Sequence, residues 1–297
     1  MADGVYVNNS AQKEFVRDQW VEFAKEIYEG KEHDFGIVTF PAEGMQDLHL
    51  FKERGLIDWE IVETESSPGN PNFKITKGNV RCFETKTSIY NKISEKLISA
   101  KVNNTDFCAY VNAQYTRIIN GSDKTFPVDV VNLDFEARLY SNLKYPIDST
   151  IKNIFEFQKK HKRDFSLFLT WSIEEAADLQ EFKELIKDVI ARNLEDPSAI
   201  KFKSSFNKEF KGVDELHYER KSAIGVSKVV IKKASHHLYK LTRNAFYVYG
   251  GNPRSRMISL LFNFTYDGST GKENILYSND VASSLLEVVD INKIPKD

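Results

Sequence analysis

One carboxylate stands directly after the most apolar stretch of the sequence. Residues 127–134 read Pro-Val-Asp-Val-Val-Asn-Leu-Asp, a composition typical of a buried strand that ends at Asp134. Ligands of open α/β sheets bind beyond the carboxyl ends of the strands. We therefore expect Asp134 at a ligand crevice, although a carboxylate at this point could also cap the turn that follows.

A second chemical feature is a basic segment at residues 201–243. It holds eleven Lys or Arg against four Asp or Glu, interleaved with the aromatic residues Phe202, Phe206, Phe210 and Tyr218. Basic side chains neutralise phosphates and aromatic rings stack on bases, so nucleic acid is one expected partner. The segment also balances the acidic residues 174–196, and a solvated helix face or a docking surface for a partner protein explains it as well. The residues named for this surface are Lys228, Lys232, Lys233, Lys240, Arg243, Arg254 and Arg256.

The apolar pattern predicts alternating strands and helices that would position these side chains. An amphipathic helix over 10–29 precedes a strand at 35–40, a helix over 43–54 and a strand at 59–63. Further strands are expected at 80–83, 127–134, 165–170, 245–249 and 257–264, with helices at 88–100, 149–160, 174–193 and 226–241. Strand-helix-strand order builds a parallel sheet, and the last two strands read as an antiparallel hairpin.

This order of elements, with acids at positions 63 and 134, resembles class I S-adenosylmethionine-dependent methyltransferases. The resemblance covers most of residues 35–266. It implies an α/β, three-layer Rossmann-like fold, whose mostly parallel seven-stranded sheet carries helices on both faces and a C-terminal antiparallel hairpin. The expected organisation is an N-terminal helical extension (1–34), the methyltransferase domain (35–270, with insertions at 66–79 and 103–126) and a C-terminal tail (271–297).

The resemblance also implies S-adenosylmethionine as the cofactor. The turn after the first strand would lie under the amino-acid part of this cofactor, where the family usually carries a Gly-x-Gly turn. This chain has only Gly44, with Glu43 beside it. The implied cofactor residues are Thr39, Pro41, Glu43, Gly44, Glu63 and Asp134, of which Glu63 would hold the ribose hydroxyls and Asp134 would face the substrate as the catalytic residue. Asn132-Leu-Asp-Phe135 is not the Asp/Asn-Pro-Pro-Tyr motif of methylation on base amino groups.

Three functions follow from these patterns. The first is methyl transfer, with nucleic acid as one candidate acceptor. The second is a binding or assembly subunit that keeps the fold while its cofactor turn has decayed. The third uses Glu84-Thr-Lys86, which resembles the core of PD-(D/E)xK nucleases and would need Asp58 or Glu63 to complete a magnesium site.

Composition excludes several other classes. The chain is 41% hydrophobic, which is ample for a buried core. It is 28% charged, with a net charge of −2. No apolar run approaches the roughly 18 residues of a membrane helix, and the N-terminus lacks the pattern of a signal peptide. Two cysteines cannot build a four-ligand zinc site. We expect a soluble cytoplasmic protein with reduced thiols and no bound metal.

Overall fold

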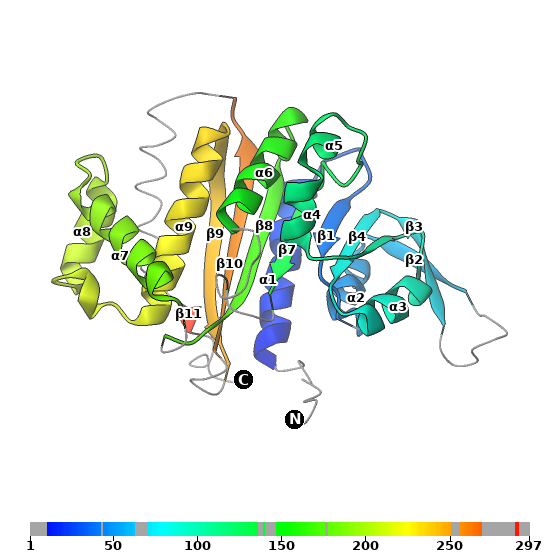
Figure 1. The fold of residues 1–297 in the computed structure, drawn as a ribbon, viewed down its shortest axis with the longest axis horizontal. Coiled ribbons are helices and arrows are strands. Elements are labelled where there is room, and N and C mark those ends of the chain that lie inside the picture. Colours follow the sequence, from blue (N-terminus) through cyan, green and yellow to red (C-terminus); the bar gives the residue numbers. More distant parts are fainter. Residues whose placement is uncertain are drawn as a thin grey trace.

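The computed structural model describes residues 11–42, 44–62, 71–135, 139, 147–175, 178–250, 256–268 and 289–290. A twisted central sheet runs through it, with the helical pair α7 and α8 at one end and a small second sheet at the other (Figure 1). Within this part of the chain, no helix is long and apolar enough to cross a membrane.

The main sheet has the strand order β11-β9-β10-β8-β7-β1-β4-β6. Strands β6, β4, β1, β7 and β8 are parallel, whereas β10 runs antiparallel to both β8 and β9. The predicted mostly parallel sheet with a C-terminal hairpin is therefore confirmed. The bounds are β1 Gly36–Thr39, β4 Asn79–Glu84, β6 Lys101–Asn104, β7 Val130–Asp134, β8 Phe165–Ile173, β9 Tyr239–Tyr249 and β10 Arg256–Tyr266, and the two-residue β11 (Val289–Asp290) adds a parallel edge beside β9.

The strand predicted at 59–63 does not join the main sheet. β2 (Asp58–Val62) pairs with β3 (Asn72–Lys77), which pairs with β5 (Leu97–Ile98), in a separate three-stranded sheet. The burial pattern explains the error. In β2 only Trp59 is buried, and Ile61 is 64% exposed, whereas every residue of the central β1 is buried, as a parallel strand covered on both faces requires. The second strand of the main sheet is consequently β4, and the third is β6.

Helices cover both faces of the main sheet and enclose two apolar cores. The helices α1 (Ala11–Tyr28), α2 (Gln46–Glu53) and α3 (Thr87–Lys96) enclose one core. The other lies under α4 (Phe107–Ala113), α5 (Tyr115–Ile119), α6 (Ile147–Lys160), α7 (Gln180–Glu195), α8 (Ile200–Glu209) and α9 (Tyr218–His236). Alternation along β8 supplies both cores, because Phe168 faces α1 while Leu167 and Leu169 face the opposite side.

The helix α1 is an integral part of its core. The Trp20 indole is fully buried and stacks on the Phe168 ring, with centroids 6.0 Å apart. Farther along α1, Phe23 meets the same ring edge-on. The segment expected as an N-terminal extension thus contributes a helix that packs against the sheet.

A close contact between α7 and α9 gives a first prediction. The Gly225→Ala substitution would place a Cβ 2.6 Å from the Cβ of Ile186 and 2.9 Å from its Cα. Separating the helices should cost about 1–3 kcal/mol, which exceeds the gain of up to about 1 kcal/mol in helix propensity. Urea unfolding monitored by circular dichroism measures the difference. Gly212→Ala is the matched control because nothing lies within 4 Å of its added Cβ. Equal unfolding midpoints for the two variants would contradict the contact.

Candidate functional site

The carboxyl ends of β4, β1 and β7 lie side by side, because β1 pairs with β4 on one side and with β7 on the other. We call this the carboxyl edge. Ligands of doubly wound sheets bind there, where the connections from neighbouring strands run to opposite faces. Thr39, Glu84 and Asp134 end these three strands, so the edge is the candidate site.

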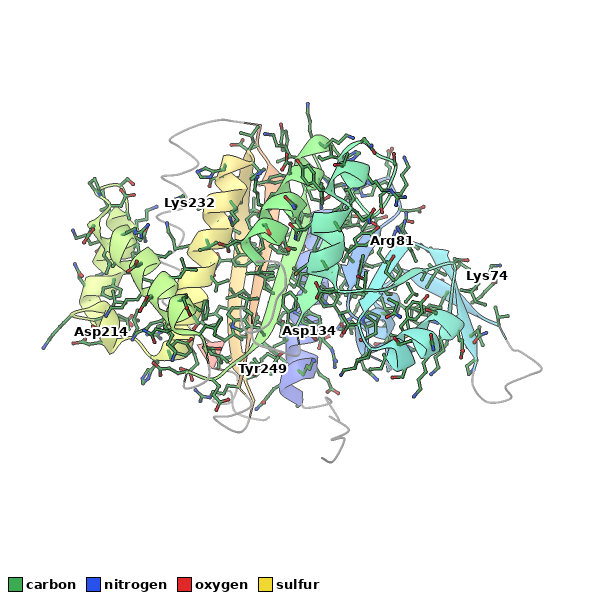
Figure 2. All side chains as sticks on the ribbon, viewed as in Figure 1. Lys74, Arg81, Asp134, Asp214, Lys232 and Tyr249 are labelled. Carbon is green, nitrogen blue, oxygen red and sulfur yellow. The ribbon has the colours of Figure 1, made fainter. Side chains whose placement is uncertain are left out.

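Asp134 forms an ion pair at this edge, as the end of β7. Its Oδ2 lies 3.1 Å from Lys13 Nζ of α1, and each side chain is 11% exposed. Tyr249, at the end of β9, lies close by (Figure 2). Its hydroxyl is buried without a hydrogen-bond partner in the described chain, and burial together with the Asp134 carboxylate raises its pKa well above the usual value. Tyr249 therefore keeps its proton and remains a hydrogen-bond donor.

A second ion pair lies behind the edge, and the sequence analysis did not predict it. Asp47, in the first turn of α2, is buried and accepts a hydrogen bond of 2.9 Å from Arg17 Nε. The Asn132 amide donates to both Asp47 Oδ2 and Thr39 Oγ1, each at 3.3 Å. Burial raises the pKa of Asp47, the Asp134 charge raises it further, and the Arg17 charge opposes both.

The sequence carries a signal for these pairs. Positions 13, 16, 17 and 20 fall on one face of a helix. Two of them are the cations Lys13 and Arg17, and the other two are the core residues Val16 and Trp20. Cations on the apolar face of a helix require buried carboxylates as partners. That requirement could have pointed to Asp47 and Asp134.

The acid that follows the second strand of the main sheet is Glu84. The resemblance gave the ribose position to Glu63, which lies outside the described residues and follows a strand of the small sheet. Glu84 instead ends β4, next to β1. It is half-buried, and its Oε1 accepts a hydrogen bond of 2.7 Å from the Lys86 backbone amide.

The turn after β1 is compact. Thr39 and Pro41 are buried, Gly44 is exposed, and Glu43 lies outside the described residues. Met45 has a left-handed backbone (φ 46°) and places its side chain in the core at 3% exposure. A Cβ on Gly44 would meet only the Gln46 side chain, at 3.6 Å. No neighbour in the described structure therefore forces a glycine at position 44.

The order of the strands identifies the fold. Numbered along the chain within the main sheet, the strands lie in the order third, second, first, fourth, fifth, seventh, sixth, eighth. The first five follow the doubly wound Rossmann order, and the antiparallel seventh strand lies between the fifth and sixth. This is the class I methyltransferase fold.

Solved structures similar to this chain are distant in sequence. Trm1 from Pyrococcus horikoshii, in complex with S-adenosyl-L-methionine, is 9% identical with a TM-score of 0.41, over 88% of this chain and 58% of Trm1. TYW2 from M. jannaschii, in complex with AdoMet, is 11% identical with a TM-score of 0.36, over 86% of this chain and 77% of TYW2. The plantazolicin methyltransferase BpumL, in complex with a desmethylPZN analogue and SAH, is 8% identical with a TM-score of 0.38, over 86% of each chain. No family model and no curated protein matches the sequence. The fold assignment therefore rests on the strand order.

The described members of the predicted basic surface are distributed over both faces and both ends of the sheet. Arg243 faces α1, with its Nη1 2.7 Å from Glu26 and its guanidinium 4.1 Å from the centre of the Phe23 ring. Lys232 and Lys233 belong to α9, which packs on the opposite face of the sheet. The pairing of β9 with β10 puts Lys240 and Arg256 at opposite ends of the hairpin. At 3.3 Å per residue, these two ends lie about 30 Å apart.

Several of the basic residues predicted for this surface are buried or form ion pairs within the protein. Lys228 is 7% exposed, and the Arg256 Nη1 lies 2.6 Å from a carboxylate oxygen of Glu219. Arg254 lies outside the described residues. Phe202 and Phe206, expected to stack on bases, are buried in the core. The exposed lysines of α8 and α9 are what remains of the proposed nucleic-acid surface.

The residues expected to form a nuclease magnesium site do not come together in the described part of the chain. β4 ends at Glu84, so strand alternation does not place Lys86 on the same face. Asp58 lies in the small sheet and pairs with Lys52. The described residues contain no group of three His, Cys, Asp or Glu side chains that could hold a metal ion.

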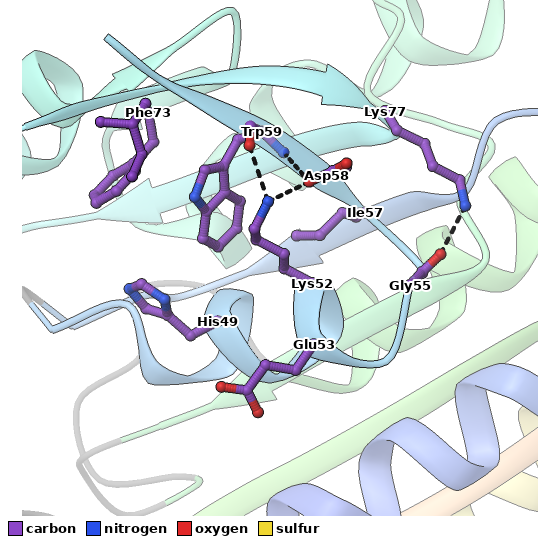
Figure 3. Close-up of a pocket in the computed structure, with 10 residues that line it drawn as sticks. His49, Lys52, Glu53, Gly55, Ile57, Asp58, Trp59, Phe73 and Lys77 are labelled. Atoms are coloured by element: carbon purple, nitrogen blue, oxygen red, sulfur yellow. Dashed lines mark hydrogen bonds and ion pairs between the residues drawn. The ribbon is translucent and has the colours of Figure 1, made fainter. Parts of the chain in front are cut away.

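A pocket of about 500 Å³ lies between α2 and the small sheet (Figure 3). The Trp59 ring packs against His49 and Phe73, with centroids 5.1 and 5.5 Å away. Lys52 binds the Asp58 carboxylate and the Trp59 carbonyl, and Lys77 donates to the Gly55 carbonyl at 2.6 Å. Because these lysines bind groups of the pocket itself, the contacts brace the small sheet against α2.

The buried Arg17–Asp47 pair gives a second prediction. Arg17→Met should destabilise the protein by about 3–5 kcal/mol at pH 7, because it leaves a buried carboxylate without its cation. The loss should shrink as the pH is lowered, since the raised pKa lets Asp47 take up a proton in the folded variant. Urea unfolding at pH 5 and pH 7 measures both effects.

Arg54→Met is the control for this experiment. The partners of Arg54, Asp18 and Glu22, are exposed, so its loss should cost less than about 1 kcal/mol at either pH. A similar destabilisation in the two variants would show that the Arg17 pair does not carry a buried charge.

Proposed function

We propose that this protein binds S-adenosylmethionine at the carboxyl edge and transfers its methyl group to an acceptor. One observation carries the proposal: the two strands that flank β1 end in carboxylates, Glu84 on β4 and Asp134 on β7. They stand on either side of the turn at residues 41–45. This is the place that the class I fold gives to a cofactor.

The residues at the edge suit such a cofactor in chemical type. The Glu84 carboxylate can accept two hydrogen bonds from vicinal ribose hydroxyls. The exposed Gly44 leaves room for the amino-acid part of the cofactor. The orphaned Tyr249 hydroxyl and Asn132 Oδ1 are a buried donor and acceptor beside Asp134 and Asp47. When bound, S-adenosylmethionine supplies a methyl group on a positively charged sulfur, and the protein contributes mainly by positioning donor and acceptor.

Asp134 is the proposed positioning group for the acceptor. Lys13 already neutralises its charge through Oδ2, and the bound cofactor would bring a sulfonium charge of its own, so a protonated acceptor would add a further unbalanced cation in a largely buried place. A neutral N–H or O–H can donate to Oδ1 without that cost. We therefore expect a neutral acceptor group rather than a protonated amine. Nucleic acid remains one candidate source, supported by the exposed lysines of α8 and α9.

A second function is favoured by the same ion pair. Lys13 occupies the Asp134 carboxylate, Met45 fills the core below the turn, and the turn lacks the second glycine of the family pattern. These features fit a binding or assembly subunit that keeps the fold without cofactor turnover. The two functions differ in whether S-adenosylmethionine binds.

Calorimetry on the full chain distinguishes them. The wild-type protein should bind S-adenosylmethionine and S-adenosylhomocysteine, and Glu84→Gln should weaken both by about 10- to 100-fold, the worth of a hydrogen bond to a charged group. Glu95→Gln, on an exposed position of α3, should leave binding unchanged. Absence of binding by the wild-type protein at high micromolar cofactor would exclude the enzyme and leave the assembly subunit.

A further inference from the structure

A second pocket lies at the amino-terminal edge of the sheet, opposite Asp134. It encloses about 410 Å³ and is lined by residues that precede or begin the parallel strands. Asn79 and Arg81 come from β4, Lys124 precedes β7, and His33 and Arg163 precede β1 and β8. We call it the amino-edge pocket.

Arg81 is the unusual residue of this pocket. Its Nε is buried without a hydrogen-bond partner in the described chain. The other guanidinium nitrogens make only long contacts, at 3.3 Å to Asn79 Oδ1 and 3.4 Å to the Val80 carbonyl. No carboxylate of the described residues forms an ion pair with it; burial lowers the pKa of Arg81, and the more distant Asp123 charge opposes this shift only in part. The Arg81 side chain is half-buried: its Nε lacks the acceptor that a buried donor normally has, while the residue lines the open pocket.

The nearby carboxylates are already engaged. Asp129 is buried beneath the pocket and accepts from the Gly36 amide at 2.7 Å, while its Oδ1 lies 2.8 Å from His33 Nε2. Arg163 approaches the same carboxylate at 3.7 Å. Asp123 accepts from the Thr125 amide and hydroxyl and pairs with Lys101. These acids serve backbone and neighbouring side chains and leave Arg81 unmatched.

The lining therefore carries an excess of positive charge. Arg81, Arg163 and the exposed Lys124 face a single lining acid, the exposed Asp34 at the rim. Even when the buried Asp129 is counted against Arg163, the balance stays positive. In the Figure 3 pocket Lys52 and Lys77 bind groups of the pocket itself, whereas no carboxylate of the described residues forms an ion pair with Arg81 or Lys124 in the amino-edge pocket.

We propose that the amino-edge pocket binds a phosphate group, as inorganic phosphate or on a small phosphorylated molecule. The planar Arg81 guanidinium suits paired hydrogen bonds to phosphate oxygens, and Lys124 adds a mobile point charge. The volume falls in the range of small-molecule sites. The pocket lies at the edge opposite the cofactor position, so the proposal stands independently of the proposed function.

Titration with inorganic phosphate tests the site. Calorimetry at constant ionic strength, with chloride as the replaced anion, should detect saturable binding by the wild-type protein. Arg81→Gln should weaken it by at least tenfold, because a charge-assisted hydrogen bond is lost. Lys124→Gln should weaken it by about threefold to tenfold. The exposed Lys124 makes this variant informative even if Arg81→Gln folds poorly.

The control is Arg117→Gln, on an exposed position of α5 whose guanidinium bonds to Gln114. It removes the same charge outside the pocket and should bind phosphate as the wild type does. The proposal is overturned if the wild-type protein shows no saturable binding beyond chloride. It is equally overturned if Lys124→Gln and Arg117→Gln bind phosphate alike.

Discussion

A buried carboxylate, Asp47, ties together the three elements that form the carboxyl edge. It lies on α2, receives Arg17 from α1 and receives Asn132 from β7. Removing two charges from water carries a penalty that their attraction only partly offsets, so such a pair is weak evidence for added stability. In this protein the pair fixes the position of α1 on the sheet. Any shift of α1 along the sheet would leave a buried charge unpaired, and the helix is therefore held where Lys13 meets Asp134.

The two edges of the sheet balance charge in different ways. At the carboxyl edge, the acids that end or follow strands meet cations from α1, whose N-terminal dipole adds to the favourable field. At the amino edge, the acids bind backbone amides and neighbouring side chains, and no carboxylate in the described part of the chain forms an ion pair with Arg81. The net charge of −2 conceals this division, since composition counts charges without saying which of them are paired.

The parts of the fold that the sequence predicts are those with continuous apolar runs. Strands at 127–134 and 165–170 and the hairpin are central, and burial on both faces requires such runs. β6 is short, half-exposed and reads Lys-Val-Asn-Asn, so it carries no such signal. The β2 run is apolar enough for a strand, but periodicity does not say which sheet it joins. That error moved the expected ribose acid from Glu84 to Glu63.

The candidate site was predictable only where it adjoins a strand with a continuous apolar run. Asp134 follows a strand whose central position is evident from its composition, whereas Lys13 and Arg17 pair with residues far along the chain. Pairing of this kind depends on where α1 packs, and the packing is set by apolar contacts. Trp20 and Phe23 hold the helix on Phe168, and Arg243 holds Glu26 near its far end. Because α1 is anchored along its length, Lys13 in its first turn is brought to Asp134 by packing between residues far apart in the sequence. No local pattern around either residue encodes that packing, which is why the carboxylate was predictable and its cation was not.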